Sequence, residues 1–432
     1  MLRRLHNKDA VFVRGVRVPF CQSGTEYEDY MAYDLQREAI KGLLRKTAIP
    51  PEEIEYVCCG TVIQEVLTSN VARESAMAAG IPLSTPAHTV TLACISSNIA
   101  MATGIDKIRS GQLDTFLAGG VEIMSDVPIR FSRPVRKRLI KSSKMKSTGQ
   151  MLGLLNGLKF SDLAPQAPGV AEFSTGEVMG HSADRLASAF GISREQQDKF
   201  AQRSHQLAFD AQAKGLFKEE IVPVKSSVKD HWVEQDNGIR PATDEQLSKL
   251  KPAFIKPHGT VTAANSSFLT DGASAALVMS EDKCKALGLS ARARMKDYVF
   301  VSQDPKDQLL LGPAYAISKL LRKTGLKIED VDVWELHEAF AGQVLANLAA
   351  LNSDAWCKQW LGTDRVGELP VERLNTRGGS LSVGHPFAAT GVRLTTWAAD
   401  RLKQEDKQLA VVAACAAGGQ GVAMLIERHP DY

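Results

Sequence analysis

The pentapeptide Leu-Leu-Arg-Lys-Thr at residues 43–47 recurs at residues 320–324, 277 positions further along the chain. After each copy of the pentapeptide the apolar residues have equivalent spacing, as expected for a helix end, a turn and a short buried strand. The segment Phe-Leu-Ala-Gly-Gly at 116–120 likewise resembles residues 414–419, where a Gly-Gly pair also follows an apolar run. A repeat of this length indicates that the chain consists of two similar halves.

Both halves alternate helical patterns with short apolar runs. The runs lie at residues 56–63, 114–118, 332–336 and 408–414. Alternation of this kind is typical of parallel strands that are covered by helices. The sequence therefore predicts an α/β fold.

The segment between the halves has a different character. Residues 127–161 carry nine Lys or Arg and no Asp or Glu. Ser193 and Gln196 are spaced as a capping box, which predicts a helix that Gly215 ends. We interpret the segment as an insertion and predict four parts: 1–125, the first part of the N-terminal half; 126–256, an inserted loop domain; 257–285, the completion of that half; and 286–432, the C-terminal half.

Composition excludes several classes of protein. The chain has 432 residues, of which 44% are hydrophobic and 23% charged, which is ordinary for globular domains and excludes disordered and fibrous classes. No apolar run reaches the ~18 residues of a membrane helix, so we expect a soluble protein. A net charge of +3 does not by itself point to an acidic partner, and we expect no binding of nucleic acid. Seven cysteines without a secretory signal indicate free thiols in a reducing compartment.

Cys94 lies where a strand-like run meets a helical pattern with Ile95 and Ile99 on one face. A thiol at a helix N-terminus has its pKa lowered by the helix dipole, which favours the nucleophilic thiolate. The backbone N–H groups there can also hold an oxyanion. The alternative is a small cysteine of the core.

Two further candidates lie in glycine-rich segments of the second half. His385, in the segment 375–386, heads a predicted helix as Cys94 does in the first half, so a junction of the two helix N-termini would bring them together. Cys415 follows the apolar run and suits a positioned acid or base, with the Ala417 and Gly418 amides free to face a ligand. A glycine-rich turn with an incidental cysteine is the alternative.

His337 follows an apolar run and precedes Glu338. No second His stands four residues on, so the zinc-binding HExxH pattern is absent. Cys58 and Cys59 are adjacent, as in a strand core, and are not spaced as metal ligands. We predict no metal site.

Together these segments resemble the thiolase family. Residues 93–96, 375–391 and 415–421 match its three signatures in order, and the resemblance covers essentially the whole chain. Its trifunctional-type branch is matched by residues 60–65, 127–130, 260–272 and 337–340. The chain departs from most thiolases in having His337 in place of Asn, and Ala388 and Ala417 in place of glycines. The resemblance implies duplicated βαβαβαββ halves in an α-β-α-β-α layered core with an inserted loop domain.

The resemblance also implies an activity, that of a 3-ketoacyl-CoA thiolase (acetyl-CoA C-acyltransferase) of fatty acid β-oxidation, with CoA as co-substrate and no other cofactor. It assigns Cys94 as the nucleophile, His385 as its base and Cys415 as an acid and base. The enolate oxygen would be held by His385 and, through a water, by His337. The amides of Cys94, Ala417 and Gly418 would hold the acyl oxygen. The positions matching contacts of the pantetheine arm or substrate are Ser267, Ala339 and Phe340.

For partners, the resemblance implies a tight homodimer or a tetramer, and an alpha subunit with hydratase and dehydrogenase activities. It implies a mitochondrial location, in the matrix or on the inner membrane; the alternative is a bacterial cytoplasm. Two alternative functions stay open, namely biosynthetic acetoacetyl-CoA formation and a weakly active scaffold subunit of a trifunctional complex.

The basic segment 130–159 suggests a further partner. Its cations exceed what the phosphates of CoA need, although CoA contact is the default for part of them. Interleaved apolar residues predict an amphipathic surface helix that docks on an anionic membrane or on the alpha subunit. These residues are Leu139, Ile140, Met145, Met151, Leu152, Leu154, Leu155 and Leu158.

Overall fold

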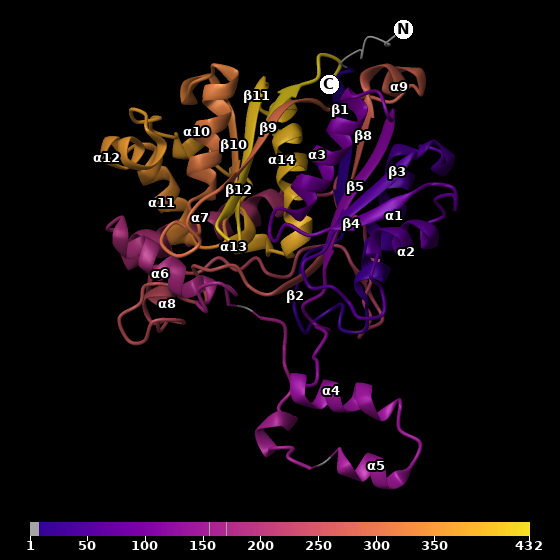
Figure 1. Cartoon of the computed structure of the whole chain (residues 1–432). Helices are drawn as coiled ribbons and strands as arrows, with labels where there is room; N and C mark the ends of the chain where they lie inside the picture. The colour runs from indigo at the N-terminus through magenta and orange to yellow at the C-terminus, as the bar shows by residue number, and fades with distance from the viewer. Residues whose placement is uncertain (1–7, 155, 170) are drawn as a thin grey trace.

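The computed structural model describes residues 8–154, 156–169 and 171–432 (Figure 1). Within these residues, ten strands form one mixed sheet in the order β10-β11-β12-β9-β1-β8-β5-β3-β4, with β2 paired to β8. The strands of the first half are β1 (Ala10–Arg17), β2 (Cys21–Gln22), β3 (Tyr56–Gly60), β4 (Ala87–Val90), β5 (Thr115–Glu122) and β8 (Thr270–Ser280). Those of the second half are β9 (Ala293–Ser302), β10 (Val333–Leu336), β11 (Leu409–Ala416) and β12 (Gln420–Arg428).

The sheet has a pseudo-twofold arrangement about the β1–β9 junction. These two strands share only the short register Val11–Arg294 and Phe12–Ala293. Outward from the junction, β8, β5 and β3 on one side correspond in order to β12, β11 and β10 on the other. In the first half, β3 pairs with the parallel strand β4. At the equivalent place in the second half, β10 has only an isolated parallel bridge to Leu374 among the described residues. The predicted duplication is therefore present in the sheet.

The repeated pentapeptide ends two equivalent helices, α1 (Ala32–Thr47) and α10 (Gly312–Thr324). Each helix is closed by a left-handed residue, Ala48 at φ 54° and Gly325 at φ 74°. A 3-10 turn follows in both halves, η1 (Pro51–Glu53) and η3 (Ile328–Asp330), and then a central strand. The left-handed residue reverses the chain so that the strand returns along the helix.

Helices separate and cover the two half-sheets (Figure 1). Between them lie α3 (Ser96–Arg109) and α14 (Thr390–Gln404), which share a core that includes Ile105 and Val392 and strand residues of both halves. Outside, α1 and α2 (Val71–Ala78) cover the first half-sheet, while α10 and α11 (Ala341–Leu351) cover the second. This is the predicted α-β-α-β-α layering, and it places the N-termini of α3 and α14 in the middle of the molecule.

A long excursion separates β5 from β8, which returns to pair antiparallel with both β1 and β5. One part packs on the body through α6 and α7, against α11 and α13. The predicted capping box begins α7, since Ser193 Oγ accepts from Gln196 N at 3.1 Å and Gln196 Oε1 accepts from Ser193 N at 2.8 Å. Elements of this part are α6 (Met179–Ala189), α7 (Arg194–Ala213), β6 (Val224–Lys225), β7 (Trp232–Val233) and α8 (Asp244–Ser248). The four predicted domain boundaries stay predictions.

The other part of the excursion projects from the body as an arm (Figure 1). We define the arm as residues 130–154 and 156–166, with α4 (Arg133–Ser142), α5 (Thr148–Gly153) and η2 (Phe160–Leu163). Two backbone hydrogen bonds between Arg130 and Gln166, of 2.9 and 2.7 Å, close its neck. Of the apolar residues predicted for an amphipathic helix, Leu155 and the side chain of Leu152 lie outside the described part of the chain.

The remaining helical elements are short. They are α9 (Glu281–Ala286), α12 (Asp354–Trp356), the π-helical turn η4 (Cys357–Leu361), η5 (Val371–Arg373), α13 (Ser380–Val383) and η6 (Phe387–Ala389). Among the described residues, no helix has both the length and the apolar character that crossing a membrane requires.

Candidate active site

Three side chains from different parts of the chain meet at the centre of the molecule. The Cys94 sulfur and ring nitrogens of His337 and His385 lie within 4.8 Å of one another. Cys94 stands two residues before α3, His337 directly after β10, and His385 between α13 and η6. The two imidazole rings are 4.0 Å apart and tilted by 43°. A sulfur and two imidazoles are also a donor set that zinc accepts, so the absence of a metal stays a prediction.

Cys94 lies in an environment that keeps its thiol protonated. Burial raises its pKa to about 12, which the amides of Ala417 and of Cys94 itself only partly offset, while the carboxylates of Glu122 and Glu172 add to the rise. The lowered pKa predicted from the helix dipole is therefore wrong. The helix begins at Ser96, so the thiol lies outside its first turn, and burial outweighs the dipole.

His385 is held as a neutral base. Its Nδ1 lies 2.7 Å from Thr390 Oγ1, and that hydroxyl donates its own hydrogen to the Pro386 carbonyl at 3.2 Å. Thr390 must then accept from Nδ1–H, so the hydrogen-bond network assigns the lone pair to Nε2. Burial and the nearby Arg393 lower the pKa of His385 to about 3. Buried Nε2 has no hydrogen-bond partner among the described residues, and it is free to take a proton from a neighbour.

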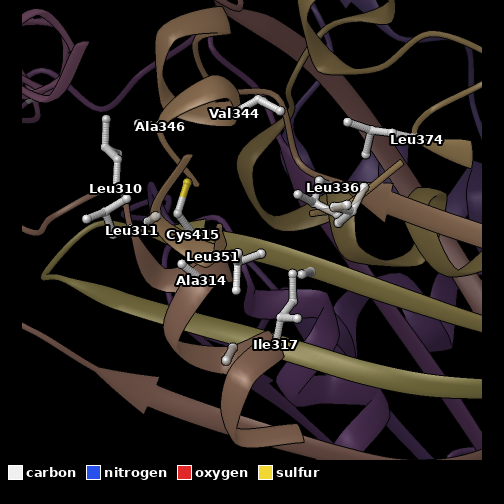
Figure 2. Close-up of a cluster of buried hydrophobic side chains, with 14 of the residues drawn as sticks. Leu310, Leu311, Ala314, Ile317, Leu336, Val344, Ala346, Leu351, Leu374 and Cys415 are labelled. Atoms are coloured by element: carbon white, nitrogen blue, oxygen red, sulfur yellow. The ribbon is translucent and has the colours of Figure 1, made fainter. Parts of the chain in front are cut away.

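Cys415 is the second-last residue of strand β11 and does not lie in the loop that follows it. We expected the strand to end at residue 414, but β11 continues to Ala416, where cross-strand pairing with β12 fixes Cys415 opposite Gly421. Figure 2 shows its sulfur among buried apolar side chains such as Leu311 and Ala314. Burial, and then the adjacent Cys94, raise the pKa of Cys415 far above its ordinary value. The thiol is thus held in its protonated form beside Cys94, and its role as acid and base stays a prediction.

Comparison with known proteins identifies the family. Residues 10–282 match the family described as Thiolase, N-terminal domain, and residues 289–428 match Thiolase, C-terminal domain. The chain belongs to the thiolase family. This thiolase is 58% identical over 424 residues to the human protein named "Trifunctional enzyme subunit beta, mitochondrial", covering 98% of this chain and 89% of that protein. The predicted family and its acyltransferase class are confirmed.

Two further comparisons agree. A Caenorhabditis elegans protein named "Probable 3-ketoacyl-CoA thiolase" is 56% identical over 420 residues, which cover 97% of this chain and 94% of that protein. The crystal structure of human mitochondrial 3-ketoacyl-CoA thiolase in complex with CoA superposes with a TM-score of 0.83 at 30% identity, covering 98% of this thiolase and 99% of that chain. The likeness confirms the predicted thiolase fold.

Besides the Cys94 amide, the amides of Ala417 and Gly418 were predicted to hold the acyl oxygen. In the structure one of these two amides faces the nucleophile, and the other is already hydrogen-bonded to a side chain. The Ala417 amide hydrogen-bonds to the Cys94 sulfur. Gly418 N–H instead donates to Glu172 Oε1 at 2.8 Å, so in this structure a carboxylate from the inserted segment holds it. The expectation that the Gly418 amide is free to face a ligand is therefore wrong for this state.

The three predicted substrate-contacting residues lie together beside His337. Ser267 N donates to Ala339 O at 2.9 Å, and an isolated bridge joins Ser266 to Phe340. Phe340 is the N-cap of α11, and its ring meets Phe254 of the inserted segment edge-on, at 6.3 Å. Their contact with a substrate stays a prediction.

Sequence reasoning missed the buried acids that hold the loops of the thiolase site together. Glu122, at the end of β5, accepts from the amides of Val62, Ile63 and Ala388 at 3.2, 2.8 and 3.3 Å. Burial raises its pKa to about 7. The bond to Ala388 links the first half of the fold to the loop that carries His385. An acid at the end of an apolar run, two residues after the pair Gly119-Gly120, was the sequence signal that could have identified Glu122.

Glu338 is a second such acid. Although it follows His337 as in zinc sites, it is fully buried and accepts from Ser204 Oγ at 2.7 Å, from Asn375 Nδ2 at 2.8 Å and from Leu381 N at 3.4 Å. These bonds join α7 of the insertion to the glycine-rich segment that leads to His385. Glu338 therefore anchors the site.

Proposed function

We propose that this thiolase cleaves 3-ketoacyl-CoA with CoA, giving acetyl-CoA and an acyl-CoA two carbons shorter, in fatty acid β-oxidation. The observation that carries the proposal is that the Cys94 sulfur, which keeps its proton, lies within 4.8 Å of a ring nitrogen of the neutral His385. A thiol with a base beside it is suited to nucleophilic catalysis.

In the first step, His385 Nε2 takes the proton of Cys94, and the sulfur forms a bond to the keto carbon of the substrate. Because Cys94 and His385 are both uncharged at rest, the thiolate and the imidazolium form only when the substrate is present. The C2–C3 bond then breaks, its electrons pass into the enolate of acetyl-CoA, and the acyl group stays on Cys94 as a thioester. The enolate oxygen is held by His337 and by His385, which now carries a proton on Nε2.

In the second step, the Cys415 thiol donates its proton to C2 of the enolate, and acetyl-CoA leaves. The resulting Cys415 thiolate takes the proton of an incoming CoA thiol. The CoA sulfur attacks the thioester, whose oxygen lies against the amides of Cys94 and Ala417, and Cys94 leaves with the proton that His385 returns. All four groups end as they began, and the reaction needs no cofactor beyond CoA as co-substrate.

The test is thiolysis of 3-ketoacyl-CoA substrates over a series of chain lengths, with Cys94→Ser as the matched inactive variant. Mass analysis after incubation without free CoA should find the acyl group on the peptide that contains Cys94. Label on the Cys415 peptide would reverse the two assignments. Activity confined to acetoacetyl-CoA would favour the biosynthetic alternative, and absence of cleavage at every length would favour the scaffold alternative.

We further propose that the chain is mitochondrial and acts as a homodimer beside an alpha-type subunit with hydratase and dehydrogenase activities. The support is its similarity to proteins named mitochondrial trifunctional enzyme subunit beta. Co-purification with such a subunit, and the mass of the complex in solution, test this proposal.

As a second function, we propose that the arm binds an anionic membrane. It exposes large apolar side chains beside its cations, and α4 lines a cavity of about 950 Å³ with Lys137, Ile140 and Lys141. The exposed apolar residues of the arm are Phe131, Leu139, Ile140, Met151, Phe160 and Leu163. Each cation near such a surface contributes about 1 kcal/mol.

Flotation with vesicles that contain cardiolipin, at low and high salt, tests the arm. The variant Lys137→Gln/Lys141→Gln/Lys144→Gln removes three exposed cations, and Lys214→Gln/Lys251→Gln/Lys407→Gln removes three exposed lysines elsewhere. We expect only the first to lose flotation, with thiolysis intact. Equal flotation of both variants would refute membrane binding, and loss of an alpha-type subunit instead would assign the arm to that partner.

A further inference from the structure

His337 is connected to a buried cation through one hydroxyl. Its Nδ1 lies 3.0 Å from Ser380 Oγ, and the same oxygen lies 2.7 Å from a terminal nitrogen of Arg393. Ser380 begins α13 and Arg393 lies in the first turn of α14, so two elements converge behind the imidazole. All three side chains are buried, with exposed fractions of 0%, 0% and 1%.

The direction of these two hydrogen bonds follows from the donors. A guanidinium can only donate, so Ser380 Oγ accepts from Arg393. Among the described residues, His337 Nδ1 is the hydrogen-bond partner of Ser380 that is able to accept the hydroxyl hydrogen. If Nδ1 carried a proton instead, the hydroxyl hydrogen and the Nε2 lone pair would both be buried without a partner among the described residues, whereas with the proton on Nε2 only the Nε2 hydrogen is left without one. Each unmade hydrogen bond of a buried group costs about 1–3 kcal/mol. The network therefore assigns the lone pair to Nδ1 and the proton to Nε2.

Arg393 stays a cation although it is buried. Burial lowers its pKa to about 10, and the carboxylates of Glu335 and Glu338 oppose the change. Its guanidinium also lies over the ring of Trp397, 4.7 Å from the centroid, which fixes its direction. Burial, and then the neighbouring His385 and Arg393, lower the pKa of His337 well below its ordinary value, so this imidazole is neutral.

The two imidazoles are consequently opposite tautomers. Thr390 Oγ1 accepts a hydrogen bond from Nδ1–H of His385, which leaves the Nε2 of that ring as a base. Ser380 Oγ donates a hydrogen bond to the unprotonated Nδ1 of His337, which leaves the Nε2–H of that ring as a donor. Both Nε2 atoms are buried and have no partner in the described part of the chain. Side chains behind the rings thus decide which ring accepts a proton and which donates one.

We propose that Ser380 and Arg393 are positioning residues that fix His337 in the Nε2–H tautomer, so that it donates a hydrogen bond to the enolate oxygen. This inference rests on the proposed thiolase reaction. His385 becomes a second donor only after it has taken the Cys94 proton, while His337 is a donor throughout. The opposite tautomer would direct a lone pair at the enolate oxygen and destabilise the enolate.

The first experiment compares two reactions of Ser380→Ala. Exchange of the C2 hydrogens of acetyl-CoA with deuterium needs the enolate, and we expect it to fall about 30-fold, within the loss of up to roughly 10²–10³-fold for a deleted oxyanion donor. Exchange of labelled CoA into acetyl-CoA acylates Cys94 without an enolate, and it should change less than about threefold. Ser380→Thr restores the hydroxyl and should restore deuterium exchange. An equal loss in both reactions would overturn the proposal.

A double-variant cycle separates tautomer control from packing. In the variant His337→Asn the amide N–H₂ donates without any tautomer, so adding Ser380→Ala should have no further effect on deuterium exchange. A loss as large as in the wild-type background would show that Ser380 acts only through packing and would overturn the proposal.

Nitrogen chemical shifts of ¹⁵N-histidine-labelled protein provide a readout that does not depend on activity. His337, assigned by its absence in His337→Asn, should show a protonated Nε2 and an unprotonated Nδ1 in the wild type, and Ser380→Ala should shift this balance. A wild-type His337 protonated on Nδ1 would refute the tautomer assignment. Failure of the thiolase reaction itself would instead appear as wild-type protein that catalyses neither exchange.

Discussion

Replacing Glu122 by Gln should change how the stability of the thiolase depends on pH. The carboxyl group is fully buried, and burial raises its pKa from 4.5 to about 7. A pKa that is higher in the folded than in the unfolded chain contributes stability below about pH 4.5, and this stability is lost as the pH rises through 7. At 1.36 kcal/mol for each pKa unit, the loss amounts to about 3 kcal/mol.

Glutamine has the shape of the protonated acid but does not titrate. Its amide nitrogen, however, cannot accept the hydrogen bonds that one oxygen of Glu122 receives from Val62 N and Ala388 N. We therefore expect Glu122→Gln to be less stable than the wild type near pH 4.5, and the difference between the two free energies of unfolding to shift in favour of the variant by about 3 kcal/mol as the pH rises to 8. Urea unfolding at half-unit steps of pH measures both proteins, and the exposed Glu368→Gln is the matched control. Parallel curves for wild type and Glu122→Gln from pH 4.5 to 8 would refute the reasoning.

Three other predictions concern the proton path and its surroundings. Cys415→Ser should still acquire an acyl group on Cys94, and it should lose deuterium exchange at the acetyl-CoA methyl group; rapid exchange in this variant would contradict the acid–base role. Thr390→Val removes the acceptor of His385 Nδ1–H, and alkylation of Cys94 by iodoacetamide should slow about 10-fold; an unchanged rate would contradict the base assignment. Glu172→Gln removes a negative charge beside the nucleophile, and the same alkylation should become a few-fold faster; a slower reaction would contradict the sign of this interaction.

The parts of the fold that follow from local sequence were predicted correctly. The repeated pentapeptide located two equivalent helices because a helix end, its left-handed cap and the next strand are encoded within about 17 residues. The capping box of α7 was visible for the same reason. Cys94, His337 and His385 were all singled out, and the structure brings them together. Their catalytic roles stay predictions.

What the sequence did not reveal depends on contacts between distant residues. The pKa of Cys94 was predicted with the wrong sign because burial between two halves of a fold leaves no mark in the flanking residues. The Gly418 amide was expected to be free, yet its acceptor, Glu172, lies 246 positions away. Glu122 and Ala388 are 266 positions apart. Ser380 lies within a quoted signature, but only its neighbours in space show what it orients.

The narrow junction between β1 and β9 divides the chemistry as well as the sheet. The nucleophile comes from one half, and the two imidazoles and the second thiol come from the other. If the two halves were separate chains, they would have to associate through α3 and α14 before the active site could form. Joining them in one polypeptide replaces that encounter by an effective concentration, of millimolar order for a short tether, which does not fall when the protein is dilute.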